Sequence, residues 1–308
     1  MYLEHHTLFN PMAPLKAYAD LMRLHFFFAW PLLFCSGYLL ATAMYGSFSW
    51  PSLIRVLFIG LLGFEGGLVL NDYIDREYDR KDTEFGRLTK YWRVFGTRPI
   101  PSGLISPKSA LLIFLLLAFS ALILIATLPY PHSLYVALIM VYCYAVEAFY
   151  QVKKRHQSFP LAQLVGRTDF ALFPVAGYLS AGFPDQTALL YFLFFYPFAI
   201  AHLGINDLAD ITNDRARGLQ TISILYGISG TVRWIVLFFI IHVFFACIFL
   251  MRLGIIARIG IPIGLILLLF ATVSLWRDSS PERALTVLPL FHISMLFYAG
   301  SLVLDVLW

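Results

Sequence analysis

Long apolar stretches alternate with short polar ones along most of this 308-residue chain. A helix needs about 20 apolar residues to cross the hydrocarbon core of a bilayer. Nine stretches have that length, and turn-forming residues such as Gly46, Pro131, Pro184 and Pro281 separate several of them. The predicted spans are 22–45, 51–72, 107–128, 131–151, 160–181, 186–206, 229–251, 255–276 and 285–306. The pattern therefore predicts an all-α integral membrane protein with nine transmembrane helices.

Composition and charge agree with this prediction. The chain is 60% hydrophobic and 13% charged, whereas a soluble domain carries about 25% charged residues. In a nine-span topology, only Arg55, Arg252 and Arg258 fall on one side of the membrane, and Arg167 lies within the fifth span. All other Lys and Arg residues lie on the side of the N-terminus. Because basic loops stay in the cytoplasm, we expect a cytoplasmic N-terminus in a multi-pass protein of the cell membrane.

Two acidic motifs end the second and sixth predicted spans, at residues 71–79 and 206–214, and each has the pattern N-D-x-x-D-x-x-x-D. Their members are Asn71, Asp72, Asp75 and Asp79 in the first and Asn206, Asp207, Asp210 and Asp214 in the second. On a helix these intervals place the carboxylates on one face. An even number of spans separates the motifs, so both emerge on the cytoplasmic side. This pattern is typical of two four-helix repeats, here followed by one extra helix.

The two motifs predict a magnesium site. Mg²⁺ dehydrates reluctantly, so proteins usually hold it with a few carboxylates together with phosphate oxygens of the substrate. We therefore expect two or more Mg²⁺ ions between the motifs, bridged by a substrate diphosphate. Metal binding would make diphosphate a better leaving group, and an allylic group could then ionise. A single motif would more often be a solvated acidic helix end, but two copies on one side favour the metal site.

Basic residues gather in the loops that follow the motif-bearing spans. They either set the topology and contact anionic lipids or contact the diphosphate, for which the candidates are Arg87, Arg98 and Arg215. Tyr150 and Lys154 are separated by one helical turn, so their phenol and ammonium groups share a face and predict a phosphate contact. Residues 85–95 are predicted to form a short amphipathic helix that lies either over the site or on lipid headgroups.

Several polar side chains fall inside the predicted spans, where their burial is costly and indicates function. Glu65 lies seven positions before Asp72, about two turns deeper on the same face. It either orients or deprotonates an acceptor, or forms an ion pair with Arg167, and we favour the ion pair. His202 lies one turn before Asn206, and we interpret it as cavity lining because Mg²⁺ prefers oxygen ligands. Glu65, Arg167 and His202 are our candidates for the acceptor side of the site.

Together, these ordered motifs resemble those of the UbiA superfamily of intramembrane prenyltransferases. The resemblance covers nearly the whole chain, which we treat as a single membrane domain of residues 1–308. It includes N-D-x-x-D at 71–75, R-P-x-P-S-G at 98–103, Y-x-x-x-K at 150–154 and D-x-x-x-D at 210–214. It implies a helical bundle around a central cavity capped by cytoplasmic loop helices. It also implies Mg²⁺-dependent transfer of a prenyl group from a polyprenyl diphosphate to an acceptor.

The resemblance implies roles for the matching residues. The metal ligands would be Asn71, Asp72, Asp75, Asp79, Asn206, Asp207, Asp210 and Asp214. The diphosphate contacts would be Asn71, Tyr150, Lys154 and, at the start of the first span, Arg23. The expected catalytic set comprises Asp72, Asp75, Asp210, Asp214, Tyr150 and Lys154.

The acceptor is the open part of the prediction. Our first choice is an aromatic quinone precursor, such as a hydroxybenzoate or a dihydroxynaphthoate. A glycerol-phosphate lipid, as in archaeal ether-lipid synthesis, is the alternative, and a tetrapyrrole is less favoured. The expected partners are polyprenyl diphosphate, the acceptor and membrane lipids, with no nucleic acid. A cation transporter would place its acids near the membrane midplane, and a CDP-alcohol phosphotransferase would show a D-G-x-x-A-R run that this sequence lacks.

Overall fold

The computed structural model describes residues 12–46, 48–84 and 88–308. Within these ranges the chain folds into helices, with no β-strand, as the sequence predicts. The α-helices are α1 (Met12–Leu21), α2 (Ala29–Tyr45), α3 (Trp50–Asp79), α4 (Leu88–Trp92), α5 (Pro107–Ala126), α6 (His132–Lys153), α7 (Leu161–Gly166), α8 (Thr168–Leu179), α9 (Gln186–Ala209), α10 (Ile211–Arg217), α11 (Ile222–Leu250), α12 (Ile255–Arg277) and α13 (Pro281–Leu307). A 3₁₀ turn at Leu24–Phe26 precedes α2.

Eight helices of the described ranges are long and apolar enough to cross a membrane. The predicted fifth span, 160–181, is instead two shorter helices, α7 and α8, that meet at Arg167. The hydroxyl of Thr168 donates to the backbone carbonyl of Val165 over 2.6 Å, and this kind of back-bonding bends helices. The predicted count of nine continuous helices is therefore not confirmed, and the arrangement in two repeats stays a prediction.

Three spanning helices begin at the same local signal. Ser49, Ser106 and Ser280 are the N-caps of α3, α5 and α13, and each hydroxyl oxygen accepts from the backbone N–H three residues later. A proline follows each serine within the first two helical positions, where its missing N–H costs no intrahelical hydrogen bond. These helix starts are therefore encoded locally.

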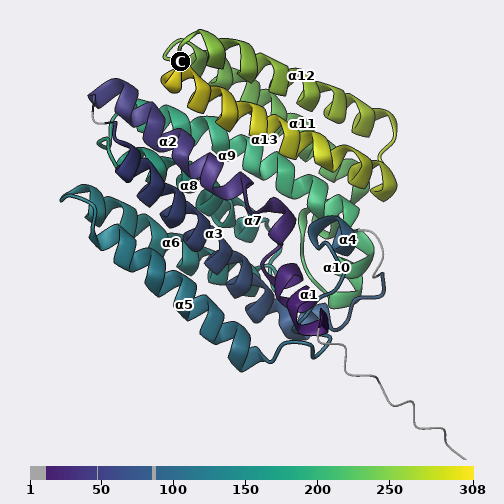
Figure 1. The fold of residues 1–308 in the computed structure, drawn as a ribbon. Coiled ribbons are helices and arrows are strands. Elements are labelled where there is room, and N and C mark those ends of the chain that lie inside the picture. Colours follow the sequence, from purple (N-terminus) through teal and green to yellow (C-terminus); the bar gives the residue numbers. More distant parts are fainter. Residues whose placement is uncertain (1–11, 47, 85–87) are drawn as a thin grey trace, which may run out of the picture.

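The long helices lie side by side in one bundle, and the short helices α1, α4 and α10 gather at one end of it (Figure 1). Helix α3, which carries the first acidic motif, packs against α2, α5 and α6. Helix α9, which leads into the second motif, packs against α8, α11 and α13. The two motifs therefore end on neighbouring parts of the bundle, under the short helices.

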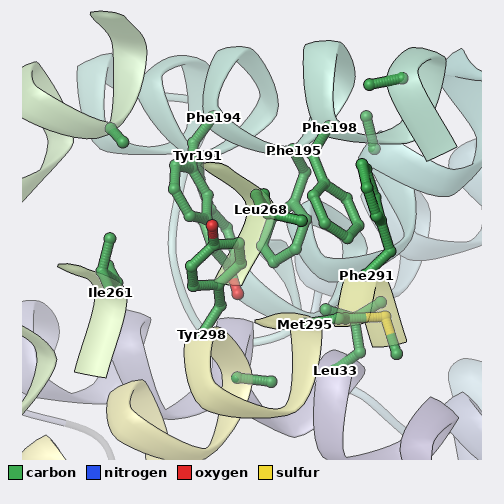
Figure 2. Close-up of a cluster of buried hydrophobic side chains, with 14 of the residues drawn as sticks. Leu33, Tyr191, Phe194, Phe195, Phe198, Ile261, Leu268, Phe291, Met295 and Tyr298 are labelled. Carbon is green, nitrogen blue, oxygen red and sulfur yellow. The ribbon is translucent and has the colours of Figure 1, made fainter. Parts of the chain in front are cut away.

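Aromatic residues fill the core between α9 and α13 (Figure 2). Phe194 and Phe198 of α9 contact Tyr298 of α13, with ring centroids 5.0 and 5.9 Å apart. Phe198 also lies 5.7 Å from Phe291. Buried aromatic pairs contribute beyond their area, by about 0.5–1.5 kcal/mol each. This cluster holds α9 in place and so positions the second motif at its end.

Helices α2 and α8 touch through two glycines. A Cβ on Gly37 would lie 2.0 Å from the carbonyl oxygen of Pro174, and a Cβ on Gly177 would lie 1.9 Å from that of Phe34. Small residues permit this close approach of helix backbones in membrane proteins. The contact fixes the close packing of the C-terminal half of α8 against α2.

We expect Gly177→Ala to lower the free energy of unfolding by about 1–3 kcal/mol, because the added methyl group overpacks the contact with α2. Thermal denaturation of the detergent-solubilised protein measures this effect. Gly300→Ala in α13 is the matched control, since a Cβ there meets nothing within 4 Å. Equal melting temperatures for the two variants would contradict a backbone contact between α2 and α8.

Candidate active site

A cavity of 270 Å³ lies between the inner helices, and residues of the short helices α4 and α10, among them Trp92 and Asp214, contribute to its lining. Its polar end is lined by Asn71, Asp75, Asp79, Asn206, Asp207, Asp210 and Asp214. Its apolar walls are formed by Trp30, Phe64, Phe170, Phe173, Phe198 and Met295. Seven of the eight motif residues therefore face one space, and Asp72, a predicted metal ligand, is not part of this lining. The aromatic surface beyond them suits an apolar substrate chain.

The first motif lies entirely within α3, and its first two carboxylates are paired with basic groups. Asp72 accepts from Nη2 of Arg93 over 2.7 and 2.9 Å and from Nη2 of Arg23 over 3.1 Å. Asp75 lies 2.5 Å from Nζ of Lys154. Both aspartates are buried, and a buried carboxylate without a counter-charge is strongly destabilising.

Asp79 continues the same pattern with two further arginines. Its carboxylate lies 2.7 Å from Nη1 of Arg98 and 3.4 Å from Nη2 of Arg217. Asp82, just beyond the end of α3, accepts a hydrogen bond from Nε of Arg217 over 2.5 Å and lies 2.9 Å from Nε of Arg98. Asp82 thus adds a carboxylate next to the first motif that the predicted pattern did not include.

The second motif does not lie on one continuous helix, because α9 ends at Ala209 and α10 begins at Ile211. Asp207 accepts from the backbone N–H of Ile222 over 3.0 Å, and Asp214 accepts from the hydroxyl of Thr221 over 2.8 Å. Burial raises the pKa of Asp210. Burial, together with the nearby Asp210 and Asp207 carboxylates, raises the pKa of Asp214 well above its usual range. These acids therefore favour a cation in the cavity beside them.

Arg217 links the two motifs, although the sequence analysis selected Arg215 as the diphosphate contact. Arg217 Nη1 lies 3.2 Å from Asp210 and 3.6 Å from Asp214, in addition to its contacts with the first motif. Arg215 is exposed, and Arg217 lines the cavity. The spacing of the sequence already favoured Arg217 over Arg215. Residue 217 follows Asp214 by three positions and shares its helical face, whereas residue 215 does not.

The predicted Tyr150 and Lys154 pair lies at the cavity wall. Nζ of Lys154 lies 4.9 Å from the centre of the Tyr150 ring, and the Arg167 guanidinium lies 5.5 Å from the same ring. In the described ranges, the Arg167 guanidinium makes no ion pair within 4.0 Å, although it lines the cavity. Such a half-buried cation is available to an anionic group of a ligand.

The predicted ion pair between Glu65 and Arg167 is not formed. Both carboxylate oxygens of Glu65 are buried without a hydrogen-bond partner in the described part of the chain. Asp72, two turns after Glu65 on the same face of α3, accepts from Arg23 rather than from Arg167. Glu65 also lies outside the cavity lining, so the structure offers no contact between it and an acceptor there.

Helix α4 covers the cavity and is held there by its aromatic side chains. This helix lies within the predicted segment 85–95, whereas Arg87 lies outside the described residues. Tyr91 bonds to Nδ1 of His292 over 2.5 Å, and Trp92 donates to the Oδ1 atom of Asn206 over 3.2 Å. Burial raises the pKa of the Tyr91 hydroxyl, so this hydroxyl stays protonated.

His202 lies in the cavity wall, as we interpreted it from the sequence, and it is next to His292 of α13. The Nε2 atoms of the two rings are 3.0 Å apart. His292 is an isolated polar residue of the last span, and no local pattern marked it. Arg23 and Arg98, both predicted diphosphate contacts, also line the polar end of the cavity.

The donor set of the site suits Mg²⁺ only together with a substrate. Its carboxylate oxygens are the ligands that Mg²⁺ prefers. However, among the described residues, no three His, Cys, Asp or Glu side chains converge closely enough to hold a metal ion. Additional oxygens from a bound phosphate group would complete such a site.

Comparison with known proteins gives consistent family matches. The family model described as the UbiA prenyltransferase family matches residues 28–296. A 4-hydroxybenzoate octaprenyltransferase of Vibrio cholerae is 39% identical over 24% of this chain and 24% of its own length. A protoheme IX farnesyltransferase of Yersinia enterocolitica is 28% identical over 66% of this chain and 64% of its own length. The matches thus span about a quarter to just under two thirds of the length of these relatives.

Solved structures share the fold over almost the whole chain. The apo UbiA homolog of Aeropyrum pernix has a TM-score of 0.74 at 17% identity, covering 92% of this chain and 98% of its own. The UbiA homolog of Archaeoglobus fulgidus bound to DMAPP and Mg²⁺ has a TM-score of 0.69 at 18% identity, covering 93% of this chain and 98% of its own. A digeranylgeranylglyceryl phosphate synthase has a TM-score of 0.68 at 21% identity, covering 95% of this chain and 98% of its own.

We expect Arg217→Gln to lower the free energy of unfolding by about 3–5 kcal/mol, because it leaves the acids of both motifs without their shared counter-charge. Thermal denaturation in detergent without divalent cations measures the change. Arg283→Gln is the control, since Arg283 makes an exposed ion pair with Asp278, and exposed pairs contribute about 0–1 kcal/mol. A loss no larger in Arg217→Gln than in the control would show that Arg217 does not hold the motifs together.

Proposed function

This chain belongs to the UbiA prenyltransferase family, and on that premise we propose that it transfers a polyprenyl group from an allylic polyprenyl diphosphate to an aromatic quinone precursor. It is an integral multi-pass membrane protein, so the transfer would take place within the membrane. One observation carries the proposal: two acidic motifs and a set of basic side chains meet at the polar end of a cavity with aromatic walls. This arrangement matches a substrate with a charged diphosphate and an apolar chain.

The polar end of the cavity would bind the diphosphate and its metal ions. Asp75, Asp79, Asp210 and Asp214 would supply oxygen ligands, and bound Mg²⁺ would neutralise the charge that develops on the leaving diphosphate. Lys154 is positioned beside Asp75 to donate to a diphosphate oxygen. The UbiA homolog of A. fulgidus bound to DMAPP and Mg²⁺ supports this assignment by its shared fold.

The aromatic walls would hold the prenyl chain and exclude water from the reacting carbon. Phe64, Phe170 and Phe173 lie in the cavity wall beyond the polar end, and ring faces attract a cation. The allylic C–O bond breaks with its electron pair passing to the diphosphate. A ring carbon of the acceptor then forms the new C–C bond, and the ring loses a proton to restore its aromaticity.

Two carboxyl groups in the cavity wall are our candidates to receive that proton. Glu147 of α6 and Asp169 of α8 both line the cavity, and Glu147 accepts a hydrogen bond from Asn71 over 2.7 Å. They replace Glu65 in this role, because Glu65 does not line the cavity.

An aromatic acceptor with an acidic group is favoured over the alternatives. The half-buried Arg167 makes no ion pair in the described ranges, so a carboxylate of a hydroxybenzoate or a dihydroxynaphthoate would give it a partner. The 4-hydroxybenzoate octaprenyltransferase among the relatives supports this choice. A glycerol-phosphate lipid acceptor remains the alternative, supported by the fold of the digeranylgeranylglyceryl phosphate synthase. A cation transporter is disfavoured, because the acids lie at one end of the bundle.

The function is tested with purified protein in nanodiscs, labelled geranylgeranyl diphosphate, Mg²⁺ and a panel of acceptors. The panel contains a hydroxybenzoate, a dihydroxynaphthoate, a glycerol-phosphate lipid and a haem. We expect a prenylated aromatic product by mass spectrometry, one diphosphate released per product, and no product after chelation of the metal. Transfer only to the lipid would establish the alternative acceptor, and no transfer to any acceptor would refute the proposal.

We expect Asp75→Asn to reduce transfer about 100-fold or more, because the amide keeps the shape of the side chain but loses the charge that stabilises the metal-bound transition state. Initial rates of product formation measure the effect. Asp278→Asn, an exposed carboxylate paired with Arg283, is the matched control and should keep the wild-type rate. Near-wild-type turnover of a folded Asp75→Asn variant would remove Asp75 from the metal site.

A further inference from the structure

One oxygen of Glu147 receives two amide groups at the wall of the cavity. Its Oε1 atom accepts from Nδ2 of Asn71 over 2.7 Å and from Nε2 of Gln151 over 2.5 Å. Glu147 and Asn71 line the cavity, whereas Gln151 is fully buried and lies outside the lining. A primary amide has a donor end and an acceptor end, so these two bonds decide which end of each amide faces Glu147.

Asn71 therefore turns its amide oxygen away from Glu147. Its NH₂ group is engaged by Glu147, and its Oδ1 atom has no hydrogen-bond donor in the described ranges. Because Asn71 lines the polar end of the cavity, this oxygen is left for a ligand there. The opposite orientation would present an NH₂ group, which cannot replace the oxygen ligands that Mg²⁺ requires.

Gln151 extends the same control to Lys154. Its NH₂ group donates to Glu147, so its Oε1 atom faces the other way and accepts from Nζ of Lys154. Nζ also donates to Asp75, and an ammonium group has three N–H donors. One donor therefore remains for a ligand in the cavity, and two fixed contacts set its direction. Residues 147, 151 and 154 can act together because they share one face at the end of α6.

We propose that Glu147 is a positioning residue, which orients Asn71 directly and Lys154 through Gln151. An amide oxygen and an ammonium N–H are thereby fixed in the cavity wall before the substrate arrives. The inference rests on the proposed function, because that function supplies the diphosphate and its metal ions. It also separates the two carboxyl groups that could receive the proton of the acceptor ring. Glu147 is engaged by two amides, which leaves Asp169 for the proton.

The first test measures binding of inorganic diphosphate with Mg²⁺ to the protein in nanodiscs, by isothermal titration calorimetry and without an acceptor. Glu147→Leu removes the shared acceptor oxygen at similar volume. We expect its dissociation constant to rise at least about tenfold, the factor expected for one hydrogen bond to a charged group. Gln151→Leu keeps the bond to Asn71 and releases Lys154 alone, so its loss of affinity should be smaller.

Two further variants separate orientation from other roles of Glu147. Glu147→Gln keeps an oxygen that can accept from both amides, so it should bind diphosphate and transfer the prenyl group much as the wild type does. Glu77→Leu is the matched control, because Glu77 is exposed and pairs with Arg80, and its affinity should equal that of the wild type. A lower melting temperature of Glu147→Leu with unchanged affinity would mean a merely structural role and would overturn the proposal.

Transfer assays distinguish orientation from proton transfer. Glu147→Leu should raise the KM for the prenyl diphosphate, and Glu147→Gln should restore it. A group that receives the proton contributes about 100-fold or more to the rate. If Glu147→Gln binds diphosphate normally but loses transfer by that factor, the carboxyl group itself takes part in the chemistry and the inference is wrong.

The binding assay needs no turnover, so it fails independently of the proposed function. Absence of prenyl transfer with Glu147-dependent binding would refute the proposed function alone, and transfer with Glu147-independent binding would refute this inference alone. If Glu147→Leu does not fold, Gln151→Leu decides: a raised dissociation constant supports the inference and an unchanged one overturns it.

Discussion

Charge balance among buried aspartates is the constraint on which the rest of this structure depends. The acids of the two motifs lie at the edge of an apolar bundle, where an unpaired carboxylate is costly. Arg93, Lys154, Arg98 and Arg217 supply the opposite charges, and they come from loops and short helices rather than from the membrane spans. Pairing with the acids therefore draws these segments back over the end of the bundle and closes the cavity there.

The same pairing prepares the cavity for an anionic ligand that arrives with cations. Each of these four basic groups already lies beside a carboxylate, so bound Mg²⁺ would replace the base at the acid while diphosphate oxygens would replace the acid at the base. The total charge of the site changes little in such an exchange. The fold thus keeps opposite charges paired beside an apolar region in the free state. In the bound state, Mg²⁺ and diphosphate would add positive and negative charge together, so the site would stay close to neutral balance.

Charged residues in and near the spans show that local sequence patterns locate such residues but do not identify their partners. The sequence placed Arg167 in a membrane span and predicted Glu65 as its partner, because both are charged residues in apolar surroundings. The pairing was wrong because Glu65 lies outside the cavity lining, whereas the break between α7 and α8 leaves Arg167 in the cavity wall. Likewise Arg217, rather than Arg215, contacts the acids because the bend at Asp210 turns that face of α10 inward.

The sequence by itself determined eight of the nine expected spans, the serine and proline starts of three helices, and the two acidic motifs with their common spacing. These features depend on neighbours within one or two helical turns, so local periodicity is sufficient to predict them. Only the tertiary structure decided which base pairs with which acid, that α4 covers the cavity through Tyr91 and Trp92, and that His292 meets His202. Those contacts join residues far apart in the chain, and their partners follow from helix packing rather than from any local pattern.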